Sequence, residues 1–116
     1  MPYHRLDVYK KSYQLALEVH RLTMKFPKTE QYEMGSQIRR SSKSIPVNIA
    51  EGMGKQESPK DVHRFITIGL GSCDEKRVWL EFAKDLGYLP ESEYEKLSES
   101  YCEIGRMLRG LQNRYR

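Results

Sequence analysis

Three basic side chains lie within five residues of one another, in the stretch QIRRSSK at residues 37–43. They are Arg39, Arg40 and Lys43. Guanidinium groups bind phosphate through paired hydrogen bonds, and a lysine ammonium binds it as a point charge. On a helix, Arg40 and Lys43 fall opposite the apolar line through Ile38, and Arg39 falls on its flank. This pattern predicts a basic patch that contacts nucleic-acid backbone, with a solvated face that binds nothing as the equally weighted alternative.

A second basic group lies near the end of the sequence, where no acidic residue follows Glu103. Its members are Arg106, Arg109, Arg114 and Arg116. They are a second candidate surface for nucleic acid, although cations in the last turns of a helix also complement its dipole. The neighbouring Tyr115 could stack on a base, but its place on an apolar line favours core packing.

Patterns for catalysis or metal binding are weak. The histidines, His4, His20 and His63, have no HxxxH or ExxH spacing, EGMGK departs from the phosphate-loop pattern, and no serine lies in a nucleophile elbow. We interpret Glu51 and Glu75 as capping or buried hydrogen-bonding groups rather than metal ligands. We therefore expect no enzyme activity, no cofactor and no metal.

Composition indicates one domain that spans residues 1–116. The net charge of +4 suits an anionic partner without requiring one. No apolar run approaches the roughly 20 residues that a bilayer needs, and charges interrupt the N-terminal stretch, so we expect no membrane association and a cytoplasmic location. Cys73 and Cys102 lack CxxC spacing and are expected to be small buried thiols.

Four helices must position these groups. The first is expected to begin with Asp7 as N-cap and to end before Pro27. The second should start around residue 29 or 30 and stop at Gly52 and Gly54. The core lines of these two helices comprise Val8, Leu15, Val19, Leu22 and Phe26, then Met34, Ile38, Ser42, Ile45, Ile49 and Met53.

The third helix has clear start and stop signals. Ser58 is a capping serine, Pro59 suits the first helical position, and Gly87 suits a left-handed C-terminal cap. The fourth helix begins near Glu91. Its apolar residues alternate spacings of three and four, as in a bundle seam: Tyr94, Leu97, Tyr101, Ile104, Leu108, Leu111 and Tyr115. Short connections and the absence of period-two alternation predict an all-α, antiparallel up-down-up-down four-helix bundle.

Two features of these helices go beyond a simple bundle. The third helix carries a second apolar face with Trp79, Phe82 and Leu86, which predicts an oligomer interface, although part of this width is ordinary core. In the second helix, Pro46 removes a backbone donor and should bend the helix, while Ser41 and the neighbouring serines leave room for a close helix pair.

The motifs QIRR, SIPVNIAEG and LGYLP, with Glu30, Gly54, Phe65 and Glu75 between and around them, resemble the bacterial four helix bundle proteins also known as large-subunit ribosomal RNA intervening-sequence proteins. The resemblance covers most of the chain. It implies an antiparallel bundle that assembles as a homo-oligomer, with a pentamer as the preferred state, and no defined enzymatic activity. Some relatives in diversity-generating retroelements are basic accessory proteins that bind nucleic acid and a reverse transcriptase.

The chain departs from the family pattern at Gly35 and Cys73, where leucine is usual, and at Lys76 and Arg77, in a stretch that is commonly leucine and acidic. The last two add positive charge and put the subunit contacts of the third helix in question. Two functions follow from the sequence: a non-enzymatic, oligomeric accessory protein that binds RNA, or a scaffold that binds a partner protein without nucleic acid.

Overall fold

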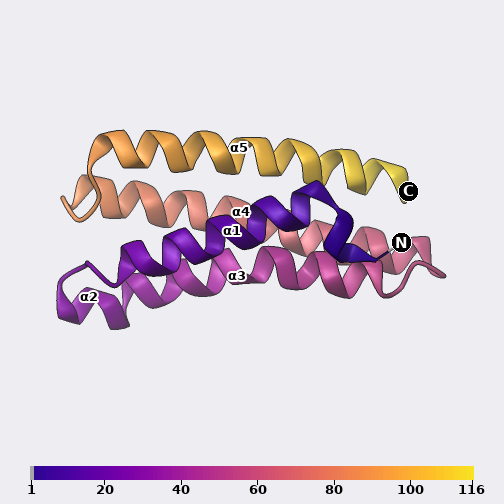
Figure 1. Ribbon diagram of the computed structural model, residues 1–116, viewed down its shortest axis with the longest axis horizontal. Coiled ribbons are helices and arrows are strands. Elements are labelled where there is room, and N and C mark those ends of the chain that lie inside the picture. Colours follow the sequence, from indigo (N-terminus) through magenta and orange to yellow (C-terminus); the bar gives the residue numbers. More distant parts are fainter. Residues whose placement is uncertain (1) are drawn as a thin grey trace.

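The computed structural model describes residues 2–116, and four long helices account for most of them (Figure 1). The elements are the 3-10 turn η1 (Tyr3–Arg5) and the helices α1 (Asp7–Thr23), α2 (Lys28–Tyr32), α3 (Met34–Met53), α4 (Pro59–Asp85) and α5 (Glu91–Arg114). No strand occurs between residues 2 and 116. The long helices alternate in direction, which confirms the predicted all-α four-helix bundle.

The bundle is elongated, with extents of 45 × 23 × 20 Å. Helix α3 packs against both α1 and α4, and α4 packs against α5, whereas α1 meets α5 much less. Both ends of the chain lie at the same end of the bundle, and α2 lies at the other (Figure 1). None of the helices in the described part of the chain is both long and apolar enough to cross a bilayer.

The seam of α5 is the best-predicted part of the core. Its central residues are buried: Leu97, Tyr101, Ile104, Leu108 and Leu111. The facing helices contribute side chains with no exposed surface, among them Val19, Ile38 and Ile66. Side chains that recur every three or four residues stay on one side of a helix, so this spacing gives each helix a continuous apolar stripe.

The termini of α4 follow the predicted signals. Ser58 caps the helix, because its Oγ accepts a hydrogen bond from the Asp61 backbone N–H at 3.3 Å, and Pro59 is the first helical residue. Gly87 has φ of +83°, the left-handed conformation that glycine adopts without a steric penalty. At α1 the prediction was wrong: Leu6 is the N-cap, and Asp7 is the first helical residue, where its charge complements the helix dipole.

The second predicted helix is not continuous. Glu33 has φ of −97° and ψ of −88°, and this non-helical residue separates α2 from α3. The chain packs tightly here, since a Cβ on Gly35 would lie 3.0 Å from the carbonyl oxygen of Glu30. No proline or glycine stands at the break itself, so the sequence carries no local signal for it.

Helix α3 continues through Pro46, which is buried. The preceding serines bond to their own helix: Ser42 Oγ donates to the Ile38 carbonyl at 2.7 Å, and Ser41 Oγ donates to the Gln37 carbonyl at 3.0 Å. Ser44 and Ser72 share a hydrogen bond of 2.8 Å between α3 and α4. Small hydroxyl side chains therefore allow α3 and α4 to approach closely, as predicted.

Candidate nucleic-acid interface

Arg39 ties α3 to the two preceding helices. Its Nη1 donates to Thr23 Oγ1 at 2.9 Å, and its Nη2 donates to the Gln31 carbonyl at 2.7 Å. Thr23 is fully buried, and its hydroxyl in turn donates to the His20 carbonyl. The Arg39 side chain is thus half-buried, and its guanidinium donates hydrogen bonds to groups of the same chain. From the sequence we expected it at the edge of an exposed basic patch.

Arg40 and Lys43 differ from Arg39 because both are exposed. Within residues 2–116 the structure has two ion pairs, Lys11–Glu103 at 2.7 Å and Lys84–Asp85 at 3.5 Å. Neither involves Arg40 or Lys43. Their charges are therefore not neutralised by a carboxylate of the same chain and can attract a polyanion.

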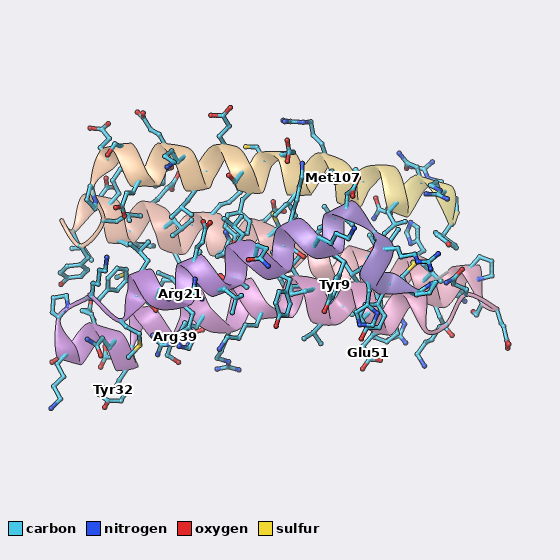
Figure 2. All side chains as sticks on the ribbon, in the orientation of Figure 1. Tyr9, Arg21, Tyr32, Arg39, Glu51 and Met107 are labelled. Carbon is cyan, nitrogen blue, oxygen red and sulfur yellow. The ribbon has the colours of Figure 1, made fainter. Side chains whose placement is uncertain are left out.

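Basic side chains from α1 and α3 lie on the same face of the bundle, and the pKa of His20 indicates their presence. Burial lowers the pKa of the His20 imidazole. The positive charges of Lys43, Arg39 and Arg21 lower this pKa further. Figure 2 shows Arg21 and Arg39 on neighbouring helices, toward the end of the bundle where α2 lies. The imidazole of His20 thus senses the positive charges of three cationic side chains from α1 and α3, so the α1–α3 face is a region of positive potential.

The C-terminal arginines lie on α5 and just beyond it. All four are exposed: Arg106, Arg109, Arg114 and Arg116. Tyr115 is half-buried and packs against the core, as its position on the seam predicted. The structure thus has two separate basic surfaces, one on the α1–α3 face and one on the outer side of α5 near its end.

The predicted apolar face of α4 is partly exposed. Phe82 and Leu86 keep 52% and 54% of their surface accessible, and Val78, one turn earlier, keeps 51%. Trp79 is half-buried and lies 6.0 Å from Phe82 between ring centroids. The neighbouring Ala83 is fully buried. We define Val78, Phe82 and Leu86 as the α4 apolar ridge.

The family model for 23S rRNA-intervening sequence proteins matches residues 4–110. This range includes α1 to α4, most of α5 and both basic surfaces except the last two arginines. The chain belongs to the 23S rRNA-intervening sequence protein family. No curated protein matches the sequence.

A solved structure of a similar protein supports the family and the fold. It is the 1.70 Å crystal structure of a protein of unknown function from the S23 ribosomal protein family of Bacteroides thetaiotaomicron. The two chains are 30% identical, and the match covers 97% of this chain and 99% of the other, with a TM-score of 0.84. The four-helix arrangement is therefore shared over essentially the whole length.

One departure from the usual residues of 23S rRNA-intervening sequence proteins is deep in the core. Lys76 has no exposed surface, and its Nζ lies over the Tyr101 ring. Neither Lys76 Nζ nor the Tyr101 hydroxyl has a hydrogen-bond partner, although the latter lies near Ser42, whose own hydroxyl donates to Ile38. Burial lowers the pKa of the Lys76 ammonium well below its usual range. This lysine therefore adds no charge to the surface, in contrast to the sequence-based expectation.

Two further expectations changed. Glu51 and Glu75 are both exposed within helices, so the interpretation as caps or buried hydrogen-bonding groups was wrong. Cys73 is buried and its Sγ donates to the Tyr101 carbonyl at 3.4 Å, whereas Cys102 is half-buried, and both are free thiols.

Sequence reasoning also missed a row of tyrosines at the start of the chain, for which the i, i+4 spacing of Tyr9 and Tyr13 was an available signal.

Proposed function

We propose that this chain is a non-enzymatic, oligomeric RNA-binding accessory protein of the cytoplasm. The observation that carries the proposal is the grouping of exposed cations, none of them in an ion pair, on two surfaces. These are Arg40 and Lys43 on α3 and the arginines Arg106, Arg109, Arg114 and Arg116 at the C-terminal end. Cations without internal partners bind phosphate at the smallest cost, because no ion pair must first be broken.

The family description adds the kind of nucleic acid. It names 23S rRNA, so structured RNA is the natural partner to test. Of the predicted patch, Arg40 and Lys43 are the contacts, and Arg39 acts as the residue that holds α3 in place beside them. Such contacts recognise the backbone rather than the base sequence.

We further propose that the α4 apolar ridge and Trp79 form a contact between copies of this chain. A row of large apolar side chains, each about half exposed, is typical of an interface. The resemblance to pentameric relatives makes a five-membered ring the preferred assembly.

A protein-interaction scaffold without RNA binding is the second candidate. The same α4 apolar ridge favours it, because a different protein could cover Phe82 and Leu86. In that case the basic surfaces are solvated faces and contribute only to solubility.

Binding to a structured RNA hairpin over a range of salt concentrations tests the proposal. The Arg40→Gln/Lys43→Gln variant should weaken binding to every sequence and lower the log–log salt slope by about 1.4 to 1.8, from roughly 0.7–0.9 per phosphate contact. The variant with all four C-terminal arginines changed to glutamine should do the same if α5 also contacts RNA. Wild-type protein that forms oligomers but binds no RNA even at low salt would favour the scaffold.

A further inference from the structure

A groove of about 710 Å³ lies between the N-terminal part of α1 and the C-terminal half of α3. Its apolar lining includes Leu17 and Val47, and Val47 keeps 56% of its surface exposed. The groove belongs neither to the core nor to the α4 apolar ridge.

Three tyrosines form one wall of the groove: Tyr3, Tyr9 and Tyr13. The ring centroids of Tyr3 and Tyr9 are 4.9 Å apart, and those of Tyr9 and Tyr13 are 5.9 Å apart. Tyr13 ends the row and keeps 46% of its surface exposed. A row of aromatic rings with one open end is a surface on which another planar ring can stack.

Lysines flank the opposite wall. Lys43 lines the groove from α3 and Lys55 from the turn that follows this helix, with Glu51 as the acidic lining residue between them. Neither lysine takes part in an ion pair, and Lys55 Nζ lies 5.9 Å from the Phe65 ring centroid. Figure 2 shows Tyr9 and Glu51 at this end of the bundle, near the chain termini.

We propose that this groove binds a single-stranded segment of RNA, whose unpaired bases stack on Tyr9 and Tyr13 and whose phosphates contact Lys43 and Lys55. The inference rests on the proposed function and names the form of RNA that this site recognises. Aromatic rings beside cations are the combination that binds single strands without sequence preference.

The test compares an unstructured RNA of about 12 nucleotides with a fully paired RNA duplex of the same length, by fluorescence anisotropy at fixed salt. Tyr13→Ala should lower the affinity for the single strand by about tenfold, leave duplex binding unchanged and leave the salt slope unchanged. Tyr13→Phe keeps the ring and should bind as the wild type does. Tyr32→Ala is the matched control, since Tyr32 is 74% exposed on α2 at the far end of the bundle (Figure 2).

Several outcomes would overturn the inference. Wild-type binding that Tyr13→Ala leaves intact would retain the proposed function and assign it to another surface. An equal loss for duplex and single strand would show that stacking is not involved. A change of molecular mass in light scattering with Tyr13→Ala would identify the groove as a contact between copies. Failure of the wild type to bind either RNA would remove both the proposed function and this site.

Discussion

The Nζ of Lys76 on α4 lies over the ring of Tyr101 on α5 in the centre of the bundle, and no carboxylate of the described chain pairs with it. A lysine can be buried in this way if it is neutral, because the cost of desolvating an unpaired charge exceeds the cost of losing the proton. Burial therefore favours the neutral amine of Lys76 by lowering its pKa, and it favours the protonated phenol of Tyr101 by raising its pKa.

Replacing this amine should stabilise the bundle. We expect Lys76→Met to raise the free energy of unfolding by roughly 1–4 kcal/mol at neutral pH, because methionine fills similar space without a polar atom. Urea denaturation measures the change. Lys60→Met, at an exposed position of the same helix, is the control and should stay within about 0.5 kcal/mol. A less stable Lys76→Met protein would mean that the amine has a stabilising partner.

The stability of the wild type should depend on pH through the same lysine. Its folded pKa is lowered, so between that pKa and the unfolded value of 10.5 the unfolded chain binds one more proton than the folded chain. The free energy of unfolding should then rise with pH, by up to about 1.4 kcal/mol per unit. From about pH 7 to about pH 9 other shifted groups contribute little, because His20 titrates below 6.5 and Cys73 above 9.0.

Urea denaturation at several pH values within this window checks the dependence. The Lys76→Met protein is the control, and its free energy of unfolding should be nearly flat. If wild type and variant share the same slope, a different group carries the proton.

Arg39 and Arg40 should respond differently to the same substitution. Arg39→Gln should lower the free energy of unfolding by about 1–3 kcal/mol, because the Thr23 hydroxyl and the Gln31 carbonyl lose a charged donor. Arg40→Gln, at the exposed neighbouring position, should change it by less than about 0.5 kcal/mol. Thermal or chemical denaturation of the two variants tests the difference, and equal effects would contradict the distinct roles of these arginines.

The α4 apolar ridge should control assembly. Phe82→Ser/Leu86→Ser should lower the molecular mass in solution, measured by light scattering at micromolar concentration, while the helical content is retained because both positions are about half exposed. Ile68→Ser, at a 44% exposed position on the same helix about four turns away, is the control. A wild-type protein that is already a monodisperse monomer would show that the ridge does not join copies.

The parts of the fold that local chemistry determines could be predicted from the sequence. The α5 seam repeats its spacing over six turns, and Ser58 with Pro59 marks a helix start by the hydrogen bonds that each residue can make. The break at Glu33 could not be predicted, because no proline or glycine marks it. Beside it, Arg39 donates to the Gln31 carbonyl, and Gly35 packs against Glu30.

The candidate site likewise has parts that could be predicted from the sequence and parts that could not. The exposure of Arg40 and Lys43 follows from their position opposite Ile38 on one helix. The partial burial of Arg39 depends on Thr23, sixteen residues earlier, and the groove depends on how α1 lies across α3. Contacts between distant segments leave no periodic signal in the sequence, so this part of the site required the structure.

The weak contact between α1 and α5 leaves one side of the bundle incompletely closed, with the exposed Lys11–Glu103 ion pair across it. An exposed ion pair contributes little to stability, so α1 is held mainly by α3. The α3–α4 pair has the most extensive contact in the bundle, and α1 and α5, each of which packs mainly on one neighbour, are the helices that can open from it by local unfolding. Amide protons of α1 would then exchange with solvent before those of α3, and the groove that α1 shares with α3 would open and close with that motion.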